Sequence, residues 1–385
     1  MGLSKQKIPI LDGFRFLSSS LVVLVHYEII FGQFLIYGAF ATTAVSWFFV
    51  VSGFILSYTY PSLDSPADYR RFYLHRVIRI YPVYALAVLV SAAFVIWGYS
   101  VGGESFFAEV RRPFEISYDL PEQKENGFWF MASLRHLSFT QSISSIETLK
   151  LVFNGPLWSL VLEVYFYILF PLLLLLLKPI NSFPRVIAAF LVGYALQFIL
   201  IQNYLPQADQ YNVMNLNVPV YTNPFIRGIE FVFGILLYKA FALSPAPDPG
   251  AKTKVGPLLL TLLAYLLVVI VGENYVPYQY SAFFITVPFI TVMVYALLRM
   301  HWYPEEKAIR FFTLLGGLSY VLYCFHWPLM EMIQYFNLLP NSLPYPIHAL
   351  LLLTLLLLVS YGIYRFIETP IRRVLYRRIQ SENLG

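Results

Sequence analysis

Long apolar segments alternate with short polar ones along almost the whole chain of 385 residues. A helix needs about 20 mainly apolar residues to cross a bilayer, and most of these segments reach that length. The pattern therefore predicts an all-α fold, a polytopic integral membrane helical bundle of about ten transmembrane helices. The expected spans are residues 9–31, 40–60, 77–98, 156–177, 184–203, 224–243, 255–272, 278–299, 311–335 and 345–368.

The distribution of Lys and Arg predicts the orientation of these spans, because cytoplasmic loops of membrane proteins are enriched in both residues. If the N-terminus is inside, most of the 26 basic residues fall in cytoplasmic segments. We therefore expect both termini to be cytoplasmic. The formal net charge of +5 then reflects topology and requires no nucleic-acid partner. The outer side keeps basic residues in one loop only, at Arg111, Arg112, Lys124, Arg135 and Lys150.

Composition supports the membrane interpretation and limits the domain organisation. With 58% hydrophobic and 12% charged residues, the chain has too little polar surface for a water-soluble globule. The single cysteine, Cys324, lies in an apolar run and is interpreted as a packing residue. We expect residues 1–385 to form one membrane domain, with an extracytoplasmic loop at about 99–155 and a short cytoplasmic tail at about 371–385.

The first span carries two ionisable residues, Arg15 and His26. Eleven residues make about three helical turns, so both side chains project from one face, roughly 16 Å apart along the axis. Ionisable groups inside a membrane are costly and often functional. A snorkelling arginine and a packed histidine explain this pair equally well, so other spans must decide.

Other spans add ionisable side chains at matching depths. Counted at about 1.5 Å per residue, His26, Glu163, Glu230 and His326 lie roughly 20 to 24 Å above the cytoplasmic edge. These four residues therefore form a predicted polar layer in the outer half of the membrane.

A second predicted layer lies at the cytoplasmic face, where four arginines gather: Arg15, Arg76, Arg79 and Arg365. Guanidinium groups bind phosphates bidentately, and a histidine can accept a proton from a hydroxyl near neutral pH. The two layers suit a ligand with phosphates at one end and a reactive group some 15 Å away. The pantetheine arm of an acyl-CoA has about that reach.

Seven stretches of the chain resemble, in order, motifs of the acyltransferase 3 family. The resemblance implies an integral-membrane enzyme that moves an acyl group, commonly acetyl, from cytoplasmic acyl-CoA to a sugar hydroxyl of a surface polysaccharide, glycolipid or glycoside. It also implies a multi-pass protein of the bacterial cytoplasmic membrane. The stretches are LDGFRFLSSSLVVLVHY, SWFFVVSGFILSY, YRRFYLHRVIRIYPVYAL, FNGPLWSLVLEVYFYILFP, IRGIEFVFGILLY, LGGLSYVLYCFHWPLM and YRFIETPIRR.

The resemblance assigns roles to residues of these stretches. It makes His26 the catalytic histidine of an Arg-x10-His motif, with Arg15 as its companion. It makes Arg76 and Arg79 the Arg-x-x-Arg pair that meets the acyl-CoA. We expect His26 to deprotonate the acceptor hydroxyl, and Glu163 to orient His26 or stabilise its protonated form.

The sequence departs from the family pattern at two places. Glu163 is followed by Val164, where the family usually carries two consecutive acids. Thr369 separates Glu368 from Pro370, where the family often has Arg or Lys. Many relatives carry a C-terminal extracytoplasmic esterase-like domain, and we expect this chain to be a stand-alone form without it.

The remaining polar and aromatic residues of these spans form a predicted acceptor-binding set. Simpler interpretations exist for several members, since Trp158 suits an interfacial belt, His326 suits a packed core, and Arg227 can neutralise Glu230. Acyl-CoA is the expected co-substrate, and no metal is expected because ligands at the usual spacings are missing. The acceptor-binding set is Trp158, Ser159, Arg227, Glu230, Tyr320 and His326.

Two other classes of protein stay open on these observations. Intramembrane His, Glu and Arg side chains also build the relays of a proton-coupled transporter or flippase of a glycan or lipid precursor. A structural assembly factor is the third class, although the buried polar layers would then have no purpose. Release of free CoA separates the enzyme from both, and proton flux in liposomes identifies the transporter.

Overall fold

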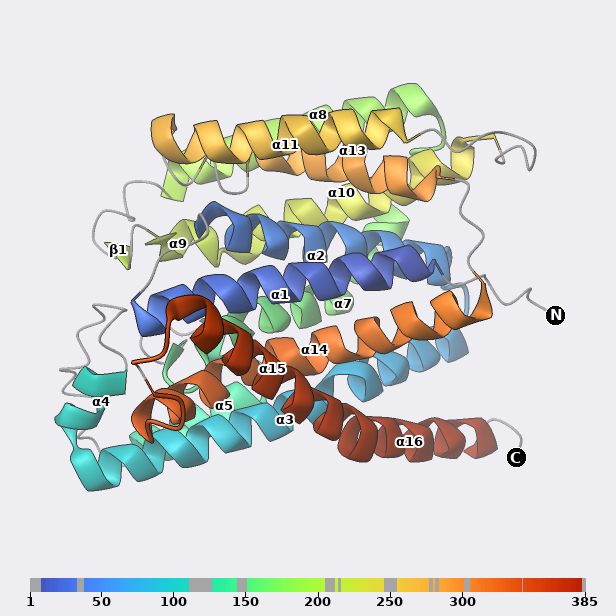
Figure 1. Ribbon diagram of the computed structural model, residues 1–385. Coiled ribbons are helices and arrows are strands. Elements are labelled where there is room, and N and C mark those ends of the chain that lie inside the picture. The colour runs from blue at the N-terminus through green and yellow to red at the C-terminus, as the bar shows by residue number, and fades with distance from the viewer. Residues whose placement is uncertain are drawn as a thin grey trace. The chain divides into compact units, whose positions relative to one another are not determined.

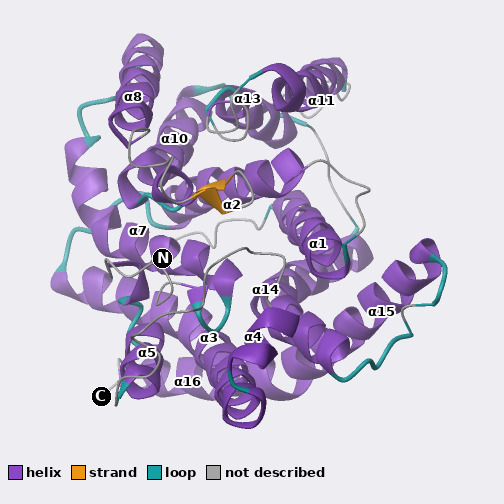
Figure 2. Cartoon of the chain, turned by 90° about the vertical axis from the view of Figure 1, so that its left-hand side faces the viewer, coloured by secondary structure: helices purple, strands orange, loops and turns teal. Residues whose placement is uncertain are grey.

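The computed structural model describes residues 8–32, 38–110, 127–143, 151–204, 212–213, 216–245, 255–276, 280, 284–300, 305–340 and 342–382. These residues are almost entirely helical (Figure 2). The strands among them are β1 (Asn212–Val213) and β2 (Leu216–Asn217), which pair antiparallel. The prediction of a helical fold is therefore confirmed.

A helix occupies all or most of each of the ten ranges that the sequence predicts as spans (Figure 1). Each of these ranges is long and apolar enough to favour a helix. The helices are α1 (Pro9–Phe31), α2 (Gly38–Thr59), α3 (Pro66–Gly102), α7 (Trp158–Leu176), α8 (Phe183–Tyr204), α10 (Pro224–Leu243), α11 (Gly256–Tyr275), α13 (Thr286–Leu298), α14 (Glu306–Tyr335) and α15 (Tyr345–Ile363).

Six helical segments in the described part of the chain are long and apolar enough to cross a membrane. The protein is therefore a multi-pass membrane protein, while ten spans and cytoplasmic termini stay predictions. The six segments are Pro9–Phe31, Pro66–Gly102, Gly155–Leu176, Phe183–Tyr204, Glu306–Tyr335 and Tyr345–Ile379.

Several helices extend beyond the predicted spans. Helix α3 begins at Pro66, ahead of the expected start at 77, and α14 begins at Glu306, ahead of 311. After α15 the chain continues through a π-helical turn, η6 (Tyr364–Glu368), into α16 (Thr369–Glu382). Charged residues end a hydrophobic window, but they do not end a helix. The predicted cytoplasmic tail is therefore largely helical.

The predicted outer loop at about 99–155 also contains helices. These are α4 (Glu104–Val110), α5 (Phe128–Leu137) and two short 3₁₀ turns, η3 (Gln141–Ile143) and η4 (Gly155–Leu157). Phe106 of α4, Phe128 of α5 and Phe153, just before η4, are buried and form one apolar cluster with Val95 of α3. The segment therefore packs against the end of α3 by apolar burial.

The chain divides into two compact units. Unit 1 comprises Met1–Val22, Tyr37–Tyr69 and Tyr165–Gly316, and unit 2 comprises Val23–Ile36, Arg70–Val164 and Gly317–Gly385. Helices α1, α3, α7 and α14 contribute residues to both units.

Unit 1 is built on a close contact between α2 and α10. A Cβ atom on Gly53 would collide with the carbonyl oxygen of Phe231, and one on Gly234 would collide with that of Val50. Small residues that let two backbones approach are a common packing device in membrane helices. The glycines therefore set the spacing of this helix pair.

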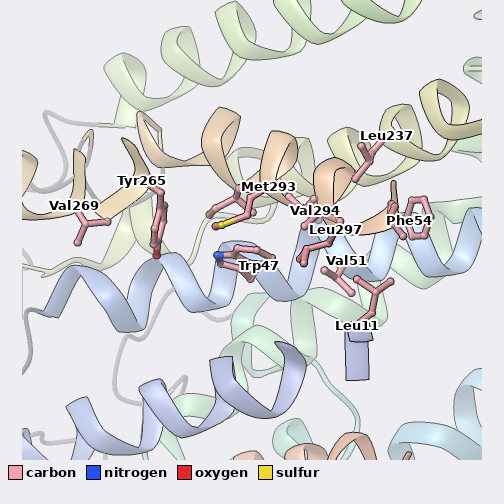
Figure 3. Close-up of a cluster of buried hydrophobic side chains, with 13 residues drawn as sticks. Leu11, Trp47, Val51, Phe54, Leu237, Tyr265, Val269, Met293, Val294 and Leu297 are labelled. Carbon is pink, nitrogen blue, oxygen red and sulfur yellow. The ribbon is translucent and has the colours of Figure 1, made fainter. Parts of the chain in front are cut away.

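An apolar cluster lies in the interior of unit 1 (Figure 3). It joins α2, α10, α11 and α13 through buried side chains that include Trp47, Leu237, Tyr265 and Met293. The hydroxyl of Tyr265 lies 2.6 Å from that of Thr43, so its polar end is also satisfied.

Candidate active site around His26

Helices α1 and α14 bring two histidines together in unit 2. Nδ1 of His26 lies 2.8 Å from Nε2 of His326. The two rings are nearly parallel, with an interplanar angle of 7° and centroids 5.1 Å apart. His326 is fully buried, whereas His26 is partly accessible. Two members of the predicted outer layer are therefore hydrogen-bonded neighbours.

The other nitrogen of His326 faces its own helix. Nδ1 lies 2.8 Å from the carbonyl oxygen of Tyr323 and 3.2 Å from that of Leu322. His326 was predicted in the acceptor-binding set, and in the structure both of its nitrogens contact protein atoms. Its partner could not be read from the sequence, because His26 is 300 positions away.

A tryptophan and a carboxylate flank this histidine pair. The ring of Trp327 meets that of His26 edge-on, with centroids 5.2 Å apart. The indole Nε1 of Trp327 donates a 2.8 Å hydrogen bond to Oε1 of Glu331, which is 1% exposed. Sequence reasoning missed Glu331. An acid one helical turn beyond Trp327, in the apolar stretch WPLMEMI, was the signal that could have found it.

Pro328 explains how α14 is joined to the segment before α7. A proline has no backbone N–H, so the carbonyl oxygen of Cys324, four residues earlier, lacks its usual helical donor. That oxygen accepts a 3.0 Å hydrogen bond from Nδ2 of the buried Asn154. Pro328 therefore leaves the Cys324 carbonyl available to Asn154, and this bond holds the segment before α7 against α14 near His326.

Ser159 and Trp158 lie at the start of α7. The hydroxyl of Ser159 is 2.6 Å from that of Tyr323, and the Tyr323 hydroxyl also donates to the carbonyl oxygen of Pro156 at 3.0 Å. Trp158 is buried, with 7% of its surface exposed. Ser159 thus connects α7 to the turn of α14 whose carbonyl group contacts His326.

The arginines expected to bind phosphate lie on α3. Arg76 and Arg79 are both partly accessible. The guanidinium carbon of Arg79 lies 5.9 Å from the centroid of the Tyr320 ring, within cation–π range. Tyr320 was predicted in the acceptor-binding set, and in the structure it lies beside the expected donor arginine.

Glu163 is partly accessible and lies close enough to Tyr320 and Cys324 to interact electrostatically with both, as does Glu368. The carboxylate of Glu368 is 1% exposed and forms a 2.8 Å ion pair with Arg372. The polar partner that the structure gives to His26 is His326, and the predicted contact between Glu163 and His26 stays a prediction.

Arg15, Arg227 and Glu230 belong to unit 1. Arg227 and Glu230 form a 2.9 Å ion pair, and both side chains are fully buried. The Arg227 guanidinium carbon lies 5.4 Å from the ring centroids of Phe49 and Tyr221. The two charges compensate each other, as the simpler interpretation of the sequence expects. In the described part of the chain, no three His, Cys, Asp or Glu side chains are grouped as a metal would require.

The fold and these side chains define a multi-pass membrane protein with ionisable residues held together inside a helical unit. The chain matches the acyltransferase domain family, acyltransferase 3, over residues 8–365. It therefore belongs to the acyltransferase 3 family, as the sequence motifs indicate.

Three relatives are similar to almost the whole chain. A peptidoglycan O-acetyltransferase, OatA, of Listeria monocytogenes is 23% identical over 96% of this chain and 56% of its own length. The O-acetyltransferase OatA of Staphylococcus aureus is 22% identical over 96% of this chain and 58% of its own. A putative peptidoglycan O-acetyltransferase, YrhL, of Bacillus subtilis is 24% identical over 95% of this chain and 55% of its own. The chain thus spans little more than half the length of these relatives. No solved structure matches it.

Proposed function

We propose that the protein is a membrane O-acetyltransferase that moves an acetyl group from acetyl-CoA to a sugar hydroxyl of a cell-wall glycan. Membership of the acyltransferase family supports transfer of an acyl group. The names of the relatives support acetyl as the group and peptidoglycan as the first acceptor to test. The site residues then support particular steps.

The observation that carries the proposal lies on α14. This helix contributes Tyr320, which is the ring beneath Arg79, and His326, which contacts His26. The two positions are six residues apart, which is about 9 Å along a helix at 1.5 Å per residue. With the side chains added, the guanidinium and the histidine pair lie on the order of 10 to 15 Å apart. A pantetheine arm spans such a distance.

The donor end of the proposed site uses arginines. Arg76 and Arg79 bind the phosphates of acetyl-CoA through their planar guanidinium groups. Arg15 is proposed as a third donor residue on the strength of the family motif. Glu163, near Tyr320 and Cys324, would act beside the path of the pantetheine arm.

The reaction end uses His26 as general base. Its imidazole removes the proton of the acceptor hydroxyl, and the resulting alkoxide attacks the thioester carbonyl. The carbon–sulfur bond breaks, and the proton held by His26 passes to the CoA thiolate. An ester and free CoA are the products, and no electrons are exchanged.

The proposal also places the protein in a bacterial cytoplasmic membrane. Acyl-CoA is a cytoplasmic metabolite, so the arginines must open to that side. This orientation agrees with the excess of Lys and Arg in the segments expected to be inside.

The test measures CoA release and acetylated glycan together. Purified protein in lipid bilayers receives radiolabelled acetyl-CoA and peptidoglycan fragments, and we expect label in the glycan and a thiol equivalent for each acetyl group moved. His26→Ala should abolish transfer, because it removes the base. Proton flux across liposomes without CoA release would favour a transporter instead.

A further inference from the structure

A chain of hydrogen bonds connects His26 to the backbone of α14, and its atoms fix where the protons lie. A carbonyl oxygen can only accept a hydrogen bond. Nδ1 of His326 lies 2.8 Å from the carbonyl oxygen of Tyr323 and therefore carries a hydrogen. In a neutral imidazole the other nitrogen, Nε2 of His326, is then an acceptor.

The proton assignment passes on to His26. Its Nδ1 lies 2.8 Å from the acceptor nitrogen of His326 and must therefore donate. A neutral His26 with a hydrogen on Nδ1 has its lone pair on Nε2. We infer that His326 is a positioning residue. It holds His26 in the tautomer whose Nε2 can take the proton of the sugar hydroxyl. This inference rests on the proposed function, in which His26 is the base.

The arrangement resembles the logic of a catalytic triad, in which one group orients the histidine and stabilises its charged form. Here a neutral imidazole, fixed by a backbone carbonyl, takes the place of the carboxylate. When Nε2 of His26 takes the hydroxyl proton, its Nδ1–H keeps the bond to His326. The same proton then leaves from Nε2 to the CoA thiolate, so His326 gains and loses none.

A second contact restrains the His26 ring from another side. Trp327 meets it edge-on at 5.2 Å between centroids, and Glu331 fixes the indole through a 2.8 Å hydrogen bond. His326 and Trp327 both come from one turn of α14. The ring of His26 is thus oriented by two neighbouring side chains of a single helix.

Two substitutions of His326 separate positioning from packing. His326→Gln keeps an oxygen that can accept the bond from His26, whereas His326→Leu keeps bulk without an acceptor. We expect His326→Leu to lower kcat by about 100-fold or more, since a positioned general base contributes roughly 10²–10⁴-fold. The KM for acetyl-CoA should stay within about 2-fold, because the donor arginines are untouched. His326→Gln should recover a measurable part of kcat.

His348→Leu is the matched control. His348 is also a buried histidine of unit 2, 4% exposed, and it contacts Tyr27 at 2.9 Å rather than His26. We expect this variant to keep its kcat within about 2-fold. A His326→Leu variant with the kcat of the control would overturn the inference.

Solid-state NMR spectra of the imidazole nitrogens, recorded on histidine-labelled protein in lipid bilayers, report the tautomer of His26 without measuring catalysis. Signals of His26 are assigned by their loss in His26→Ala, and wild-type protein should show a protonated Nδ1 and an unprotonated Nε2. The opposite tautomer in wild-type protein would refute the inference, and this measurement needs no folded variant at position 326. If instead wild-type protein transfers no acetyl group while the expected tautomer is seen, the proposed function fails and the proton assignment stands.

Discussion

The hydroxyl of Tyr320 donates a 2.7 Å hydrogen bond to the carbonyl oxygen of Ile80, next to Arg79 in sequence. One side chain of α14 is therefore bonded to the turn of α3 that carries the proposed donor site, and its ring lies beneath the guanidinium of Arg79. Two substitutions of Tyr320 separate the contribution of its ring from that of its hydroxyl.

Tyr320→Phe should remove only the hydrogen bond, at a cost of about 1 kcal/mol in stability. Tyr320→Leu also removes the cation–π contact, so its loss of stability should be larger by about 0.5–2 kcal/mol. We expect the KM for acetyl-CoA to rise by less than about 3-fold in the first variant and by roughly 10-fold in the second. Equal KM values in both variants would mean that the ring does not position Arg79.

If the proposed donor site is correct, replacing its arginines by lysine should weaken acetyl-CoA binding without slowing the chemical step. Arg76→Lys and Arg79→Lys keep the charge but lose the planar fork, so KM should rise by about 10-fold at unchanged kcat. Arg185→Lys is a suitable control, because Arg185 hydrogen-bonds Asn181 and the Pro179 carbonyl on the exposed surface. Acetyl-pantetheine lacks the nucleotide phosphates and should be insensitive to both substitutions. An equal loss with this donor would argue against phosphate binding.

Breaking the buried ion pair of unit 1 should destabilise the protein strongly. Glu230→Gln leaves the Arg227 charge uncompensated in an apolar interior, which costs roughly 3–5 kcal/mol. Arg227→Met combined with Glu230→Gln removes both charges and should restore much of the thermal unfolding temperature in detergent. A wild-type unfolding temperature for Glu230→Gln alone would show that the pair does not stabilise unit 1. Loss of glycan acetylation in the stable double variant would support the predicted acceptor role.

Adding one methyl group between α2 and α10 should force the two helices apart. Gly53→Ala and Gly234→Ala each place a Cβ atom against a backbone carbonyl, and overpacking of this kind costs about 1–3 kcal/mol. Gly256→Ala is the control, because nothing lies within 4 Å of its added Cβ. A lower unfolding temperature is expected for the first two variants only. Equal values for all three would mean that this helix pair tolerates wider spacing.

The sequence predicted the helices well because a spanning segment is recognised by its own apolarity. The helices extend beyond the predicted spans at the start of α3 and in α16, where charged residues continue a helix past the apolar window. Helical rise gives the depth of each polar residue, and it brought His26 and His326 into one layer. It gives no information on which helix faces which. The hydrogen bond between these residues, and the contact of Arg79 with Tyr320, therefore required the structure.

The environment of His26 shows a second limit of sequence reasoning. The sequence predicts that the acid Glu163 orients His26, and this role stays a prediction. The structure gives His26 a histidine partner, and a backbone carbonyl completes the orientation. Such a partner carries no charge signal, so charge patterns cannot distinguish it from a packed core residue.

The covalent continuity of α14 between Tyr320 and His326 has an evolutionary consequence. Six residues of α14 separate Tyr320, which lies beside the proposed donor arginine Arg79, from His326, which contacts the proposed base His26. One helix therefore holds the side chains that contact both ends of the proposed site. Under the proposed function, substitutions in helices that contact neither Arg79 nor His26 are expected to change which sugar is acetylated while the acyl donor stays the same.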